Sequence, residues 1–219
     1  MRAKVVIVIS SLSYGGAERV TVVFAEWLAS KGYDVTVITT TQVKGPEYEI
    51  NSQVTRLKMD GDKTNKKKSH FSEVLKLREI IRKIRPSVIL GMGVPMSAYV
   101  IPATLGLSVP VVISERNDPA NFAGKRSTKI VSKLLMCFAS GFLFQTEGAL
   151  RQYPKTIQKR GQVLPNPVVQ SRIPEPYDGV REKKIVNVGR LNSQKNQELL
   201  IKAFSDVLKK HPDYTLVIY

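Results

Sequence analysis

Cysteine and long apolar runs are scarce in this chain of 219 residues. The single cysteine, Cys137, excludes an internal disulfide and suits a reducing compartment such as the cytoplasm. It lies in the apolar stretch Leu134–Phe138, so we expect it to pack in the core. No apolar run approaches the roughly 20 residues that a membrane span requires. The segment after Lys4–Ile9 predicts a turn and a helix, not a signal-peptide cleavage region.

Acidic residues are also few, with 18 Asp and Glu against 34 Lys and Arg, which gives a formal net charge of +16. A surface of this charge attracts phosphate groups, whether they belong to nucleic acid, anionic lipid or a nucleotide sugar. The hydrophobic fraction of 42% is ordinary for a globular protein. Composition therefore indicates an anionic partner, and the residue order must identify it.

Short β-branched runs alternate with amphipathic stretches, which predicts an α/β fold: a doubly wound, Rossmann-like parallel sheet over residues 1–167. In the first helix we expect one buried stripe of Val20, Val23, Phe24, Trp27 and Leu28. The predicted strands are Lys4–Ile9, Asp34–Thr39, Val54–Lys58, Val88–Leu90, Val109–Ser114, Gly141–Phe144 and Gln162–Leu164. The predicted helices are Ala17–Lys31, Phe71–Ile84, Pro95–Leu105 and Gly124–Phe138.

Residues 168–182 contain Pro174 and Pro176 without periodicity, which predicts a linker. A β-α-β pattern follows in residues 183–219, with a helix over residues 194–210 and Ser193 as its N-cap. One such unit cannot bury both faces of a sheet. We therefore expect an incomplete second Rossmann-like unit, the truncated start of a C-terminal domain, that self-associates through this segment.

The loop after the first strand contains Gly15 and Gly16. Glycines at a strand-to-helix turn let the backbone approach a ligand, and the helix N-terminus offers N–H groups to an anion, although a tight turn alone would also explain them. The usual nucleotide fingerprints are absent. There is no Gly-x-Gly-x-x-Gly with an acidic residue after the second strand, which ends in Thr39-Thr40-Thr41, and no P-loop.

A second group of candidates opens the second unit, where Arg190 follows a strand and Lys195 lies at the expected start of the next helix. Two cations beside helix N–H groups suit a diphosphate. The alternative is two solvated basic residues in a chain that is rich in them.

Three motifs occur together and in order: the Gly15–Glu18 loop, the segment Pro165-Asn166-Pro167-Val168, and Val188-Gly189-Arg190-Leu191 with Lys195 five residues beyond the arginine. With this set, the whole chain resembles the GT-B-fold glycosyltransferases, and more narrowly the retaining group 1 enzymes of glycosyltransferase family 4. The resemblance implies two Rossmann-like domains facing a cleft, the first holding the acceptor and the second the nucleotide sugar.

The resemblance also implies roles for individual residues. Arg190 and Lys195 would contact the donor diphosphate, Gly15 and Gly16 would line the cleft, and Asn166 would join the substrate-binding residues. Glu115 and Arg116 follow the fifth strand, where many relatives carry a histidine near the transferred sugar. We assign both as candidate catalytic residues, with a local surface ion pair as the alternative. No metal and no cofactor are expected.

In such enzymes a Glu-x7-Glu pair that binds the donor lies further downstream, so we expect this chain alone to be inactive. For the whole protein, the resemblance implies transfer of a hexose or N-acetylhexosamine from a UDP-linked sugar to a lipid-linked or surface glycan, as in capsule, O-antigen or lipopolysaccharide synthesis. A sugar-nucleotide epimerase and a sucrose- or trehalose-type synthase remain alternatives.

Basic residues beside apolar ones predict contact with an anionic membrane, so we expect a cytoplasmic protein on the inner face of that membrane. Nucleic acid is not expected because aromatic residues are not interleaved with the cations. A solvated basic face and a non-enzymatic polyanion-binding module are the alternatives. The basic residues concerned are Lys66, Lys67, Lys68, Lys125, Arg126, Lys129 and Lys133.

Overall fold

The computed structural model describes residues 2–59, 70–117, 126–170, 173–193 and 195–219, with the backbone alone for residues 126–129. The chain divides into two compact units, residues 1–168 and 169–219, and each is described by itself. Four lysines that we expected on the membrane-facing surface lie outside the described residues, as do the side chains of Arg126 and Lys129. These lysines are Lys66, Lys67, Lys68 and Lys125.

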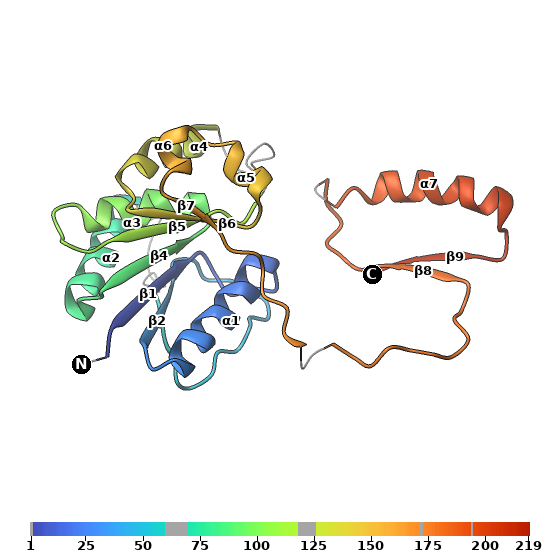
Figure 1. Cartoon of the computed structure of the whole chain (residues 1–219), viewed down its shortest axis with the longest axis horizontal. Helices are drawn as coiled ribbons and strands as arrows, with labels where there is room; N and C mark the ends of the chain where they lie inside the picture. The colour runs from blue at the N-terminus through green and yellow to red at the C-terminus, as the bar shows by residue number, and fades with distance from the viewer. Residues whose placement is uncertain (1, 60–69, 118–125, 171–172, 194) are drawn as a thin grey trace. The chain divides into compact units, whose positions relative to one another are not determined.

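The first unit is built on a seven-stranded sheet in the order β3-β2-β1-β4-β5-β6-β7, in which every pair is parallel (Figure 1). The prediction of a doubly wound, Rossmann-like sheet is confirmed, and each strand ends within two residues of its expected bounds. Central strands such as β1 are apolar on both faces because helices cover both sides of a parallel sheet. The strands are β1 Lys4–Ile9, β2 Asp34–Thr39, β3 Thr55–Lys58, β4 Val88–Met92, β5 Val111–Ser114, β6 Gly141–Phe144 and β7 Gly161–Val163.

Helices cover the two faces of this sheet unequally. One apolar core joins the sheet to α2, α3 and the segments that follow β5 and β6, whereas α1 packs on the opposite face. On that opposite face Val112 of β5 and Leu143 of β6 are only partly buried. The helices are α1 Gly16–Ser30, α2 His70–Ile84, α3 Ser97–Thr104, α4 Arg126–Leu135, α5 Glu147–Arg151 and α6 Lys155–Gln158, with 3-10 turns η1 Val94–Met96 and η2 Met136–Phe138. The two short helices α5 and α6 were not predicted.

The stripe predicted for α1 is partly wrong. The helix does bury Val20 and Leu28, but it packs on the sheet through Thr21, Val22 and Ala25. The buried Thr21 hydroxyl donates to the carbonyl of Ala17 at 2.8 Å, so this polar group is satisfied within the helix. Of the other expected members, Val23 and Phe24 are only partly buried, and Trp27 is 51% exposed.

The expectation that Cys137 packs in the core is also wrong, because its side chain is exposed. Within this apolar stretch Met136 is fully buried, while Leu134 and Phe138 are 66% and 69% exposed. Ser132 of α4 and Met136 of η2 are fully buried, whereas Ile130, Val131 and Leu134 of α4 are exposed.

The second unit contains two parallel strands, β8 Lys184–Asn187 and β9 Thr215–Ile218, joined through α7 Gln197–Lys210. This is the expected β-α-β pattern. The helix begins three residues later than expected and its N-cap is Asn196, not Ser193. The Asn196 side chain accepts a hydrogen bond from the backbone N–H of Leu199 at 3.4 Å. In the described parts of both units, no helix combines the length and apolarity needed to cross a bilayer.

Candidate functional site

The carboxyl ends of β1, β5 and β7 bring the predicted residues of the first unit to one edge of its sheet, because all strands run in parallel. Gly15 and Gly16 follow β1, Glu115 and Arg116 follow β5, and Asn166 follows β7. Ligands of open parallel sheets bind at this edge, next to the strand where the order reverses.

Glu115 is 5% exposed and its carboxylate holds the turn after β5 together. Its Oε1 accepts from the backbone N–H groups of Arg116 at 2.9 Å and Asn117 at 3.0 Å. Its Oε2 accepts from the hydroxyl of Tyr153 at 2.6 Å. Burial, and then the charge and hydrogen bond of Glu115, raise the pKa of Tyr153 above its ordinary value. The carboxylate is thus bound by three donors within the chain.

Arg116 is 8% exposed, and its guanidinium donates to the side-chain oxygen of Asn166 at 3.0 Å. Its backbone carbonyl accepts from the Gln145 side chain at 3.1 Å, and its Nε has no hydrogen-bond partner among the described residues. Burial lowers the pKa of Arg116, and the charge of Glu115 opposes this shift. Since both residues are buried, the alternative of a surface ion pair is wrong.

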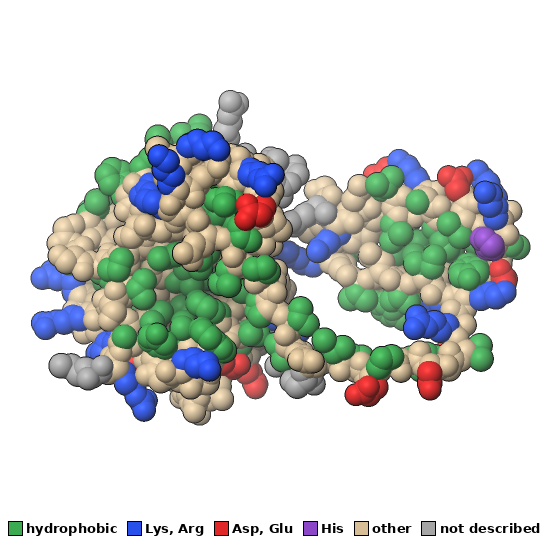
Figure 2. Space-filling view, in the orientation of Figure 1, with side chains coloured by type: hydrophobic (Ala, Val, Ile, Leu, Met, Phe, Trp, Pro, Cys, Tyr) green, Lys and Arg blue, Asp and Glu red, His purple; other side chains and the backbone are tan. Residues whose placement is uncertain are grey.

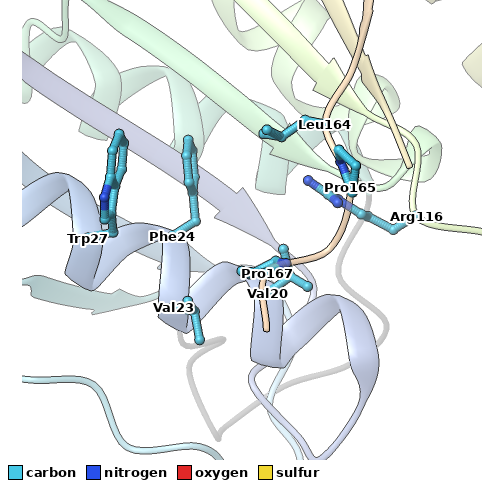
Figure 3. Close-up of a pocket in the computed structure, with 8 residues that line it drawn as sticks. All are labelled: Val20, Val23, Phe24, Trp27, Arg116, Leu164, Pro165 and Pro167. Carbon is cyan, nitrogen blue, oxygen red and sulfur yellow. The ribbon is translucent and has the colours of Figure 1, made fainter. Parts of the chain in front are cut away.

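Arg116 opens onto an apolar pocket of about 250 Å³ between α1 and the segment after β7 (Figure 3). In Figure 3 the guanidinium extends toward Leu164 and Pro165, and the aromatic rings of α1 form the facing side. Arg116 is the charged residue in this lining, so one cation faces an otherwise apolar surface. The lining residues are Val20, Val23, Phe24, Trp27, Arg116, Leu164, Pro165 and Pro167.

Gly16 begins α1, and Val20 of the same pocket lies one turn further along the helix. A Cβ atom built on Gly16 would meet nothing within 4 Å, so the space beside its backbone is open. Gly15 is extended, with φ of −165°, and a Cβ there would meet only the flexible end of Glu18. Packing within the chain therefore does not require these glycines, which leaves room for a ligand at the start of α1.

In the second unit, the loop after β8 carries both predicted cations. Arg190 is exposed and its carbonyl accepts from the Gln197 side chain at 2.9 Å. Lys195 is exposed and its side chain passes close to Gly189, whose Cβ would lie 3.6 Å from the Lys195 Cγ. Lys195 precedes α7 and is not part of its first turn, which corrects the expected position. Neither cation has an ion-pair partner in the described part of the chain.

Two residues of the first site were missed from the sequence, Tyr153 and Gln145. Tyr153 reaches Glu115 from 38 positions away, so no local pattern marked the contact. Among the described residues no group of three or more His, Cys, Asp or Glu has the arrangement of a metal site.

Residues 14–172 match the family described as Glycosyltransferase Family 4, and residues 173–219 match the one described as Glycosyl transferases group 1. An uncharacterized glycosyltransferase of Haemophilus influenzae is 28% identical over 210 residues, which cover 94% of this chain and 58% of the relative. A Campylobacter jejuni protein, named as an alpha-1,4-N-acetyl-D-galactosaminyltransferase of a PP-undecaprenol-linked saccharide, is 27% identical over 223 residues, or 98% and 60% of the two chains.

The crystal structure of Anabaena HepE in complex with UDP-glucose has the same fold, with a TM-score of 0.68 at 14% identity over 98% of this chain and 60% of that one. The chain thus spans about 60% of the length of each of these three proteins. The larger family match covers most of the first unit and ends at residue 172, and the other match covers the rest of the second unit. The chain therefore belongs to Glycosyltransferase Family 4, among the group 1 glycosyltransferases of GT-B fold.

Proposed function

We propose that the protein containing this chain transfers a hexose or N-acetylhexosamine from a UDP-sugar to a lipid-linked acceptor of surface-glycan synthesis, at the inner face of the cytoplasmic membrane. In this reaction the bond between the anomeric carbon and the diphosphate breaks, and UDP leaves with the electron pair. The acceptor hydroxyl forms the new bond to that carbon, and its proton passes to an oxygen of the departing diphosphate. We further propose that the configuration of the anomeric carbon is retained.

The observation that supports the donor part is the pair of exposed cations after β8. Arg190 and Lys195 share one loop at the carboxyl edge of their sheet, immediately before the N-terminus of α7. Negative charge develops on the leaving diphosphate in the transition state, and preorganised cations stabilise it. Arg190 can bind two oxygens at once, while Lys195 supplies a point charge. We propose that these groups serve in place of a metal ion.

The acceptor part is supported by the pocket of the first unit. Arg116 lines an apolar pocket and donates to the side-chain oxygen of Asn166, and the space beside the backbone of Gly16, at the same edge of the sheet, is open. We propose that Arg116, Asn166 and the Gly15–Gly16 backbone contact the substrates. Glu115 then acts as a positioning residue, because its carboxylate binds the turn that carries Arg116. The name of the Campylobacter jejuni relative supports an acceptor linked through a diphosphate to undecaprenol.

The test uses the full-length protein with a panel of UDP-hexoses and UDP-N-acetylhexosamines and with undecaprenyl-diphosphate-linked saccharides. We expect transfer of one sugar class, with the product anomer matching that of the donor by NMR. Arg116→Ala should raise the KM for the acceptor more than that for the donor. The matched control Arg151→Ala alters an exposed arginine of α5 and should leave both unchanged. An inverted product would contradict retention, and C2-epimerised donor without transfer would contradict the reaction class.

A further inference from the structure

Two tyrosine rings form a pair at the carboxyl edge of the first sheet. Tyr14, in the loop between β1 and α1, is 60% exposed, and its ring centroid lies 4.9 Å from that of Tyr48 at an interplanar angle of 54°. Tyr48 is partly buried against the core on the α1 side of the sheet. Tyr14 is thus open to solvent although it contacts a ring that is anchored in the protein. An exposed aromatic ring at the edge where parallel sheets bind ligands indicates a binding surface.

The backbone that carries this ring pair is fixed by several interactions. Ser13 and Glu47 form an antiparallel bridge, and the backbone N–H of Tyr48 donates to the carbonyl of Leu12 at 2.7 Å. The Glu47 carboxylate pairs with Arg56 of β3 at 2.6 Å. The two loops are therefore joined to each other and to the sheet, and a preorganised surface of this kind loses little conformational freedom when it binds a ligand.

Side chains that can bind hydroxyl groups occur in the same loop as Tyr14 and at the start of α1. The hydroxyl oxygens of Ser11 and Ser13 are 3.0 Å apart. The Glu18 carboxylate lies beside the backbone of Gly15, with its Cδ 3.0 Å from the position that a Cβ on this glycine would take. An aromatic ring combined with hydroxyl and carboxylate groups suits a ligand that has one apolar face and several hydroxyls, and the carboxylate disfavours a phosphate here.

The apolar pocket beside α1 presents different chemistry. Figure 2 shows hydrophobic side chains gathered on the face of the first unit beside this helix. Among the described residues that line the pocket, no side chain carries an oxygen atom, and Arg116 supplies the charge. A sugar hydroxyl that donates a hydrogen bond therefore finds side-chain acceptors in the loop of Tyr14 and not in the pocket.

We propose that the pyranose ring bearing the acceptor hydroxyl stacks on a platform formed by Tyr14 and Tyr48, and that Ser13 and Glu18 bind other hydroxyls of this sugar. The inference rests on the proposed function, because it assumes that the acceptor ends in a saccharide. Stacking places the C–H face of the sugar against the aromatic ring and removes both from water. It requires a flat ring at position 14 but no phenolic oxygen, so Tyr14→Phe should keep the interaction and Tyr14→Leu should lose it.

Saturation-transfer difference NMR with the full-length protein measures this binding in the absence of any nucleotide sugar. The probes are the methyl glycosides of N-acetylgalactosamine, N-acetylglucosamine, galactose and glucose. We expect the C–H protons on one ring face of at least one glycoside to receive the strongest saturation. Tyr14→Ala and Tyr14→Leu should lower this signal about threefold or more, and Tyr14→Phe should preserve it. The control Tyr33→Ala removes a 42% exposed tyrosine that precedes β2, at the opposite edge of the sheet, and should bind like the wild type. Absence of saturation for every glycoside, or an equal signal in Tyr14→Ala, would overturn the proposal.

Kinetics distinguish a failure of the platform from a failure of the proposed reaction. In the full-length enzyme, Tyr14→Ala should raise the KM for the saccharide acceptor about fivefold and leave the KM for the UDP-sugar unchanged. Transfer with an unchanged acceptor KM would overturn the platform and leave the proposed function intact. Saccharide binding that depends on Tyr14, without any transfer, would support the platform and contradict the proposed function. Should Tyr14→Ala fail to fold, judged by Trp27 fluorescence, the comparison of Tyr14→Leu with Tyr14→Phe decides.

Discussion

Tyr153→Phe removes a single hydroxyl from the buried network at the carboxyl edge of the sheet. That hydroxyl donates to Glu115 at 2.6 Å, and both residues are 5% exposed. A hydrogen bond to a charged group contributes about 1.5–3 kcal/mol, and a buried carboxylate oxygen left without its donor makes the larger value appropriate. The aromatic ring keeps its contact with Phe144, 5.1 Å between centroids, so packing changes little. We expect the free energy of unfolding to fall by about 2–3 kcal/mol.

Urea unfolding followed by the fluorescence of Trp27 measures this loss, since Trp27 is the single tryptophan and belongs to the first unit. Tyr33→Phe is the matched control. It alters a tyrosine that is 42% exposed, and its effect should stay within about 0.5 kcal/mol. In a Glu115→Gln background the same Tyr153 substitution should cost clearly less, because the charged acceptor is gone. A Tyr153→Phe protein as stable as the wild type would refute the role of this network.

Four further results are expected. Burial and Glu115 raise the pKa of Tyr153 above the ordinary value of 10.0. The stability linked to the neutral Tyr153 hydroxyl is therefore complete below about pH 10 and is lost as the pH rises further. In urea titrations, Tyr153→Phe should reduce the loss of stability at alkaline pH. In the full-length enzyme, Arg190→Ala and Lys195→Ala should each lower kcat/KM about 10²-fold, whereas Lys209→Ala on exposed α7 should not. EDTA should leave the transfer rate unchanged, and a loss restored by Mg²⁺ would contradict the metal-free proposal. The 219-residue chain should elute as a dimer or larger species in chromatography with light scattering, because β8 and α7 leave large apolar residues exposed; a monomer at tens of micromolar would argue against this.

The strands of the first unit were predictable because their signal is local. β1, β2 and β6 have the bounds that their β-branched and aromatic runs indicate. The location of the site residues was also predictable, because Gly16, Arg116 and Asn166 follow strand ends. In a parallel sheet these ends lie at one edge. Short helices such as α5 carried too few turns to show a periodicity.

The sequence alone therefore determined the parallel fold, the order of its elements, the family and the cationic loop after β8. Tertiary structure decided which of two apolar sides each helix buries: α1 turned Ala25 inward and left Trp27 outside, and α4 left Leu134 in solvent. It also decided that Glu115 is bound by Tyr153, a contact across 38 positions. Periodicity shows that a helix has an apolar side. It does not show which segments cover that side or which groups bind a buried charge, because those segments meet only in the folded protein.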